Sequence, residues 1–198
     1  MKSLSLSKPH VIVMVGIPGS GKSFFAEQFA DTFKAPLVSN GRLRYELFNE
    51  PTYSNDEQAI ISRVSDYMLD ELYKTQRTFI FEGLADARMD RQLITKKARA
   101  AGYEPLFIWV QTESSTARLR VKKAAPGKTT ISPSQFDSAL KRFSAPHSSE
   151  KAVVISGKHT YASQLRIVLK RLVEPRVELV EGQVPQARPI EGRTIVVR

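Results

Sequence analysis

Five short apolar segments recur along the chain, and each is followed by a stretch in which apolar residues return at helical spacing. The first, residues 10–15 (HVIVMV), is apolar at nearly every position, a pattern typical of a strand in a parallel sheet covered on both faces. Strands that alternate with helices are joined by right-handed crossovers. The pattern therefore predicts an α/β, doubly wound fold: a parallel five-stranded sheet with helices on both faces. The strands are expected at residues 10–15, 36–39, 77–83, 105–110 and 152–156.

The segments between these strands predict amphipathic helices. In residues 23–33, Phe25, Phe29 and Phe33 recur every four residues and predict an aromatic stripe in the core. Residues 54–76 open with the cap-forming Ser54 and two acids, as a helix start does. Its buried face is expected to run through Ala59, Ile60, Val64, Tyr67, Met68 and Leu72. Further helices are expected at residues 42–48, 88–102, 116–124, 135–143 and 161–172.

Residues 16–23 read GIPGSGKS and satisfy G-x-x-x-x-G-K-[ST], the phosphate-binding loop of nucleotide-binding proteins. They lie between an expected strand and an expected helix, which is the context the motif requires. Glycines let backbone N–H groups turn toward phosphate oxygens, and the following helix adds its positive end. Lys22 is expected to reach the β and γ phosphates, and the Ser23 hydroxyl to bind Mg²⁺. The expected nucleotide contacts are Gly16, Pro18, Gly19, Ser20, Gly21, Lys22 and Ser23.

The nucleotide and the second metal ligand are indicated by weaker signals. The Asn-Lys-x-Asp sequence of guanine-specific GTPases does not occur, so ATP is favoured over GTP. Glu82 lies near the end of the third expected strand, where this class of fold carries an acid near Mg²⁺. The alternative is a strand-end acid that faces solvent. ATP and Mg²⁺ are therefore the expected cofactors, with Ser23 and Glu82 as the metal-binding side chains.

Composition adds a charge imbalance and excludes two classes of site. The chain has 30 Lys plus Arg against 20 Asp plus Glu, a net charge of +10. A basic body suits a polyanion such as nucleic acid, although no nucleic-acid-binding motif accompanies it, and a surface charged for solubility is the alternative. No cysteine is present, which excludes disulfides and thiolate metal sites. The early apolar run at 10–15 is too short to cross a bilayer, so we expect no membrane partner and a cytoplasmic location.

Four segments, taken in order, give the chain a family resemblance: GIPGSGKS, VSNGRLRYELF, FIFEG and TARLRVKK. Together they resemble the P-loop kinases related to polynucleotide kinase and zeta toxin, among them the predicted ATP-binding proteins of the AAA_33 group. The resemblance covers residues 10–172. It implies a helical lid whose Arg118 and Arg120 stabilise charge on the transferred group. It also implies that Arg44, or its neighbour Arg42, grips an anionic acceptor.

The chain departs from the family pattern at the position of the general base. The family's Asp after the second strand falls on Gly41, and glycine cannot accept a proton. Relatives often read Asp-Ala-Thr-Asn after the third strand, whereas this chain reads EGLAD from Glu82 to Asp86. Two residues are alternatives for the missing base. One is Glu82, which would then act as both metal ligand and base, and the other is Asp86.

Three functions follow from these observations. The first is a kinase that transfers the γ-phosphate of ATP to a nucleic-acid 5′-end, a nucleotide or another small anionic acceptor. The second is a nucleotide-operated switch or pseudokinase that binds a partner, and the third is a toxin-like activity on nucleotide sugars. In each case residues 1–172 form the P-loop domain, and residues 173–198 form an extension that is a hairpin, an arm or partly disordered.

Overall fold

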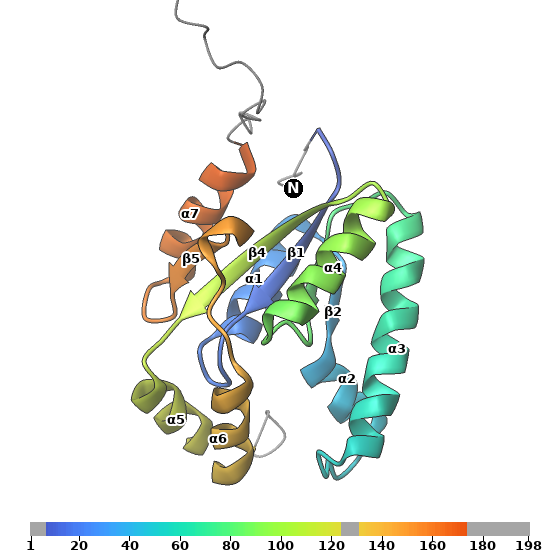
Figure 1. Cartoon of the computed structure of the whole chain (residues 1–198). Helices are drawn as coiled ribbons and strands as arrows, with labels where there is room; N and C mark the ends of the chain where they lie inside the picture. Colours follow the sequence, from blue (N-terminus) through green and yellow to red (C-terminus); the bar gives the residue numbers. More distant parts are fainter. Residues whose placement is uncertain (1–6, 124–130, 174–198) are drawn as a thin grey trace, which may run out of the picture.

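The computed structural model describes residues 7–123 and 131–173, which form a parallel sheet between two layers of helices (Figure 1). Every strand pair is parallel, and the strand order is β2-β3-β1-β4-β5. This confirms the predicted five-stranded sheet, and each strand begins and ends within two residues of its expected bounds. The strands are β1 (His10–Val15), β2 (Leu37–Ser39), β3 (Phe79–Glu82), β4 (Glu104–Gln111) and β5 (Val153–Ser156).

The strand order places the loop after β1 at the middle of the sheet's carboxyl edge. The connection from β1 runs to β2 on one side of β1, and the connection from β3 crosses to β4 on its other side. Ligands of open α/β sheets bind at the point where the direction of the connections reverses in this way. In the β2–β3 pair, Ser39 stands opposite Glu82. The last residues of these two strands therefore meet beside the loop.

Helices cover both faces of the sheet (Figure 1). On one face, α1 (Lys22–Phe33) and α7 (Tyr161–Val173) bury Phe25 and Phe29, as the aromatic spacing predicts. On the other face, α3 (Asn55–Lys74) and α4 (Arg88–Ala100) pack on the strands, with Tyr73 of α3 in that core. The short helix α2 (Asn40–Leu47) follows β2 directly.

The buried face of α3 differs from the expected one. Its fully buried side chains repeat every four residues through Ile61, Ser65, Leu69 and Tyr73. Ile60 and Tyr67, both expected in the core, are 48% and 67% exposed. Met68 and Leu72 do pack against the core, as expected. The prediction was wrong at Ile60 and Tyr67, because a serine and a tyrosine occupy buried positions and apolar spacing alone favoured a neighbouring face.

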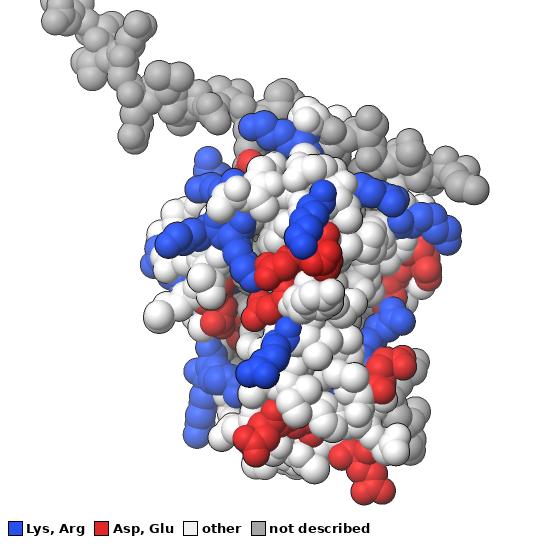
Figure 2. Space-filling model, turned by 90° about the vertical axis from the view of Figure 1, so that its right-hand side faces the viewer, with Lys and Arg blue, Asp and Glu red and all other residues white. Residues whose placement is uncertain are grey.

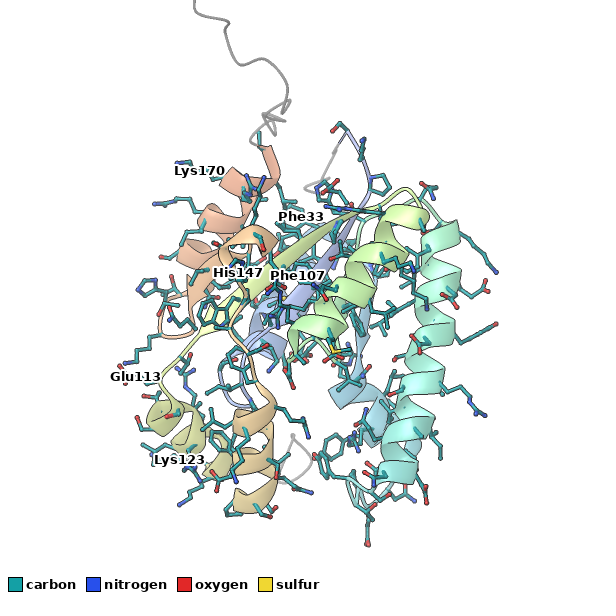
Figure 3. All side chains as sticks on the ribbon, viewed as in Figure 1. Phe33, Phe107, Glu113, Lys123, His147 and Lys170 are labelled. Atoms are coloured by element: carbon teal, nitrogen blue, oxygen red, sulfur yellow. The ribbon has the colours of Figure 1, made fainter. Side chains whose placement is uncertain are left out.

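Two helices form the lid at the carboxyl edge of the sheet, α5 (Ser114–Lys122) and α6 (Pro133–Arg142). Glu113 and Lys123, labelled in Figure 3, mark the two ends of α5. Ala117 and Phe136 pack with Ile17 of the loop after β1, which joins the lid to that loop. A short 3-10 turn, η1 (Ser148–Glu150), leads into β5.

Basic and acidic side chains alternate on the side of the molecule that carries α3 (Figure 2). On this face the net positive charge of the chain does not form one continuous basic surface. Within residues 7–123 and 131–173, no helix combines the length and apolar character needed to cross a membrane. All but the first residue of the expected C-terminal extension lies outside the described residues.

Candidate active site

The loop of residues 16–23 makes a tight turn from the end of β1 into the first residues of α1. Gly16, Gly19 and Gly21 have positive φ angles of 145°, 76° and 107°, a region that side chains rarely adopt. A Cβ on Gly16 would lie 2.7 Å from the Val110 carbonyl oxygen, and one on Gly19 would lie 2.4 Å from that of Ala117. The glycines of the motif are therefore required by backbone conformation and by close contact with β4 and α5.

Lys22, the first residue of α1, turns its side chain back over the loop. Its Nζ donates to the carbonyl oxygens of Gly16 and Ile17 at 2.5 and 3.1 Å. Burial lowers the pKa of the Lys22 ammonium, while the carboxylates of Glu82 and Asp86 act to raise it. The ammonium therefore lies where the loop, the end of β3 and the loop after β3 converge.

Glu82, the last residue of β3, joins two strands to the loop. Its carboxylate accepts from the Ser23 hydroxyl at 2.5 Å and from the Ser39 hydroxyl at 2.8 Å. The donor set is made of hard oxygen atoms, which fits Mg²⁺. No group of three or more His, Asp or Glu side chains forms a cation site in the described part of the chain. Ser23 and Glu82 alone would therefore suit Mg²⁺ that takes its remaining ligands from phosphate and water.

Asp86 lies in the loop after β3, and a buried arginine holds this loop in place. Arg91, which is fully buried, donates to the carbonyl oxygens of Ala85 and Asp86 at 2.9 and 3.1 Å. The same guanidinium pairs with both carboxylate oxygens of Glu150, at 2.7 and 3.2 Å. A further bond to the Asp86 carbonyl comes from the Ser144 N–H at 2.9 Å. The backbone of Asp86 is thus held by the neighbouring helix α4 and by the distant segment that follows α6.

The Asp86 carboxylate itself faces the cations of the site. Burial raises the pKa of this carboxyl group, and the charges of Lys22, Arg142 and Arg91 oppose that shift. Among the described residues, no side-chain hydrogen bond engages the carboxylate. The carboxylate oxygens of Asp86 are therefore free of side-chain partners among the described residues and lie within electrostatic reach of Lys22.

The two lid arginines occupy different environments, although both belong to α5. Arg120 donates to the Gly157 carbonyl at 3.0 Å, with longer contacts to Ser20 and Gly19 of the loop at 3.4 and 3.5 Å. Arg118 instead pairs with the Asp137 carboxylate and lies 4.7 Å from the centroid of the Phe136 ring, both in α6. Arg120 borders the phosphate loop, whereas Arg118 joins the two lid helices.

Arg44 is buried between α2 and α3. Its guanidinium pairs with the Glu57 carboxylate, donates to Gln58 Oε1 at 2.6 Å and lies 4.4 Å from the centroid of the Tyr53 ring. Glu57 also accepts from the N–H and hydroxyl of Thr52, at 2.6 and 2.9 Å. In this structure the Arg44 guanidinium has partners inside the protein. Its expected role of gripping an anionic acceptor stays a prediction.

Several residues that shape the site were not found from the sequence: Ser39, Arg91, Ser144 and Glu150. Ser39 has a local pattern that predicts a helix cap: it ends a short strand just before α2. In the structure its side chain accepts from the Arg42 N–H at the start of that helix. The Arg91–Glu150 pair joins positions 59 residues apart and leaves no local pattern. Gly41 lies in the first turn of α2, so no carboxylate is present at the expected position of the base.

The strand order and the loop of residues 16–23 define a P-loop nucleotide-binding fold. The family model of AAA_33, an AAA domain, matches residues 11–146. The chain therefore belongs to the AAA_33 family, and the expected resemblance to the P-loop kinases is confirmed. A search of curated proteins gives no match.

Solved structures show the same fold at low sequence identity. A sugar kinase from Janibacter sp. HTCC2649 is 15% identical with a TM-score of 0.63, over 83% of this chain and 96% of that one. Kti12 from Chaetomium thermophilum, solved with ADP-AlF3, is 15% identical with a TM-score of 0.64, over 83% and 100%. The Pnkp1/Rnl/Hen1 RNA repair complex contains a chain 19% identical with a TM-score of 0.60, over 70% and 45%. At these identities the likeness establishes the fold alone.

Proposed function

We propose that this protein is an ATP-dependent kinase that transfers the γ-phosphate to a hydroxyl of a nucleic-acid 5′-end, a nucleotide or another small molecule. One observation carries the proposal: Glu82 links Ser23 of the phosphate loop to Ser39 of β2, beside Lys22. An acid beside the phosphate-binding loop is common to this class of fold, but the second bond of Glu82, to Ser39, connects the loop to the end of β2. Such a connection suits a phosphotransferase, because the metal and the acceptor must meet at the γ-phosphate.

In this proposal the donor is held by the loop and the lid. The phosphates are surrounded by backbone N–H groups of the loop, those of Gly16, Gly19, Ser20 and Gly21, with Pro18 beside Gly19. Lys22 leaves its carbonyl partners to reach the β and γ oxygens. Ser23 and Glu82 hold Mg²⁺, which when bound neutralises charge on the phosphates. Arg120 closes the donor side next to the loop.

Asp86 serves as the general base in place of the aspartate missing at Gly41. It accepts the proton of the acceptor hydroxyl, whose oxygen then bonds to the γ-phosphorus. The bond from that phosphorus to the β–γ bridging oxygen breaks, and ADP leaves. Glu82 is less suited to this step because both of its oxygens already accept from serine hydroxyls. Arg44 supports the site by holding α2 against α3.

The direct test is phosphate transfer from γ-labelled ATP with Mg²⁺ to a panel of acceptors: a 5′-hydroxyl oligonucleotide, nucleosides, nucleotides and sugars. We expect a labelled acceptor that disappears in Lys22→Ala and persists in Lys96→Ala. Lys96 is a suitable control because it is an exposed lysine of α4. If no acceptor is labelled although ATP is hydrolysed, the kinase proposal is wrong.

A nucleotide-operated switch is the second candidate, and one observation favours it. Gly41 supplies no base, and Arg44 is paired with Glu57 where an acceptor anchor was expected. In a switch, ATP would change the lid without transfer of its phosphate. Limited proteolysis with ATP, ADP and no nucleotide tests this: we expect the ATP and ADP forms to differ in the lid region, and identical cleavage patterns would exclude the switch.

A further inference from the structure

A groove lies between α3 and α4. Both helices lie on the face of the sheet opposite α1 (Figure 1). Its cavity volume is about 250 Å³. Since an apolar cavity of roughly 150 Å³ accommodates benzene, this volume admits a nucleobase and part of its sugar. The walls are mainly apolar and include two aromatic rings. They are formed by Leu69, Tyr73, Phe81, Leu84, Leu93 and Ile94.

The two ends of the groove are different. Near one end, Tyr73 packs edge-on against Tyr103, and Lys97 of α4 bridges to Asp70 and Asp66 of α3 at 3.0 and 3.6 Å. The other end is lined by Asn40 and Leu84. Asn40 directly follows Ser39, and Leu84 lies two residues after Glu82, so this end adjoins the pair that links β2 to the phosphate loop.

One of the residues that line the groove carries a buried polar atom without a hydrogen-bond partner among the described residues. Asn40 Oδ1 is buried and, within the described residues, accepts no hydrogen bond. A buried amide oxygen without a partner is unfavourable, and native structures seldom retain one. A ligand that carries an N–H or O–H donor would satisfy it, while the apolar walls hold the rest of that ligand.

The charges around the groove disfavour an anionic ligand. Lys97 is the only basic side chain among the residues that line it, and this lysine is already paired with two carboxylates. Asp66 and Asp90 are the acidic lining residues, so acids outnumber bases. Arg44, the expected anchor for an anion, is paired with Glu57 outside the groove. A phosphate placed here would face carboxylates with no free cation to offset them.

We propose that the groove between α3 and α4 is the acceptor subsite and that it binds an uncharged, ring-containing molecule of nucleoside size, with a donor group on Asn40 Oδ1. As an acceptor subsite it rests on the proposed kinase function, whereas the binding itself does not. In this arrangement the ring lies between the apolar walls, and the acceptor hydroxyl extends past Leu84 toward Asp86. The sequence led us to expect an anionic acceptor, whereas the lining of the groove favours an uncharged one.

The test measures binding without ATP, so that it does not depend on catalysis. The full chain is titrated with adenosine, guanosine, cytidine and uridine, and with their 5′-monophosphates, by saturation-transfer NMR and calorimetry. We expect at least one nucleoside to bind and its monophosphate to bind about tenfold more weakly, because the added charge lies at the end of the groove near Asp86 and Asp90. No binding by any of the four nucleosides, or tighter binding of the monophosphates, would overturn the proposal.

Three variants locate the binding site. Leu93→Trp adds a large ring at a half-open wall position that is 66% exposed, so the fold should tolerate it, and we expect at least a fivefold loss of affinity. Asn40→Ala should lose about five- to tenfold, the effect of one hydrogen bond. Ile167→Trp, at an exposed aliphatic residue of α7 on the opposite layer, is the matched control and should change nothing. Equal affinity in Leu93→Trp and Ile167→Trp would place the ligand elsewhere.

The same variants separate this proposal from the kinase proposal. If nucleosides bind in the groove but no acceptor is ever labelled, the kinase function fails and its role as acceptor subsite fails with it, while the binding site stands. If an acceptor is labelled at a rate that Leu93→Trp and Asn40→Ala leave unchanged, the kinase function stands and the groove proposal is wrong.

Discussion

The proposed donor side and the proposed acceptor side of the site are built in different ways. On the donor side, the loop of residues 16–23 gains its shape from three glycines with positive φ angles and from contacts with β4 and α5. On the acceptor side, side chains from distant segments set the positions: Arg44 with Glu57 between α2 and α3, and Arg91 with Glu150 behind Asp86. One side depends on local backbone geometry, and the other depends on ion pairs between distant segments.

This difference shows where change is tolerated. A loop that needs glycine at several positions cannot vary without losing phosphate binding. Paired side chains can be exchanged for other pairs, and the groove between α3 and α4 can change its lining without disturbing the loop. Substrate choice in such a fold therefore resides on the acceptor side. Variants on each side should break the protein in different ways.

The largest effect is expected on the donor side, from Lys22→Ala. Removing the ammonium that meets the β and γ phosphates should lower phosphate transfer by about 10³-fold, as loss of one preorganised charge at a reacting phosphate does. Thermal unfolding should stay close to that of the unmodified protein, because the two hydrogen bonds of Lys22 go to carbonyls of its own loop. Retained transfer in Lys22→Ala would mean that the loop is not the donor site.

The next effect is expected from Asp86→Asn, which removes the proposed base and keeps its shape. Transfer should fall by about 10²-fold, within the range for general bases. Since burial raises the pKa of Asp86, the rate of the unmodified protein should fall with decreasing pH already above the ordinary pKa of aspartate. That acid limb should be absent in Asp86→Asn. A pH profile unchanged by the substitution would assign the base elsewhere, with Glu82→Gln as the variant to compare.

Asp86→Asn, which should lower activity, should leave the stability of the fold unchanged or raise it. A carboxyl group whose pKa is raised in the folded state makes the fold less stable as pH rises from the unfolded pKa through the folded one. Asp86→Asn should therefore unfold at the same or a higher temperature at neutral pH. Loss of activity together with gain of stability is the pattern of a residue retained for function. A marked drop in melting temperature would instead indicate a structural role.

A smaller effect on activity but a clear effect on stability is expected from Arg44→Ala. The guanidinium and the Glu57 carboxylate are 7% and 4% exposed, so the substitution leaves a buried charge without its partner. The free energy of unfolding should fall by about 3 kcal/mol, measured by chemical denaturation. Lys74→Ala, which removes the exposed ion pair with Glu71, is the control and should leave unfolding unchanged. A stable Arg44→Ala protein that binds its acceptor more weakly would restore the sequence-based role of Arg44.

The loop after β1 and the sheet could be predicted from the sequence because their determinants are local in the chain. The glycines, Lys22 and Ser23 lie within one motif, and the alternation of strands and helices gave the sheet. The acceptor side escaped prediction because Glu57, Glu150 and Ser144 become neighbours of Arg44, Arg91 and Asp86 only in the folded chain. The groove was not predicted, since it depends on which face of α3 is buried, and Ser65 and Tyr73 hide that face from apolar spacing.

Gly41→Asp tests whether the acceptor side already has a general base, and it should have the smallest effect. It restores the carboxylate that related kinases carry after the second strand. Gly41 lies in the first turn of α2 and has no positive φ angle, so the aspartate should be tolerated and even favoured there by the helix dipole. If Asp86 is the base, transfer should change by less than about twofold, because the reaction already has a proton acceptor. A large gain in Gly41→Asp, measured with the acceptor that the unmodified protein labels best, would mean that the acceptor side lacks a base, and that Asp86 lies beside Lys22 without taking part.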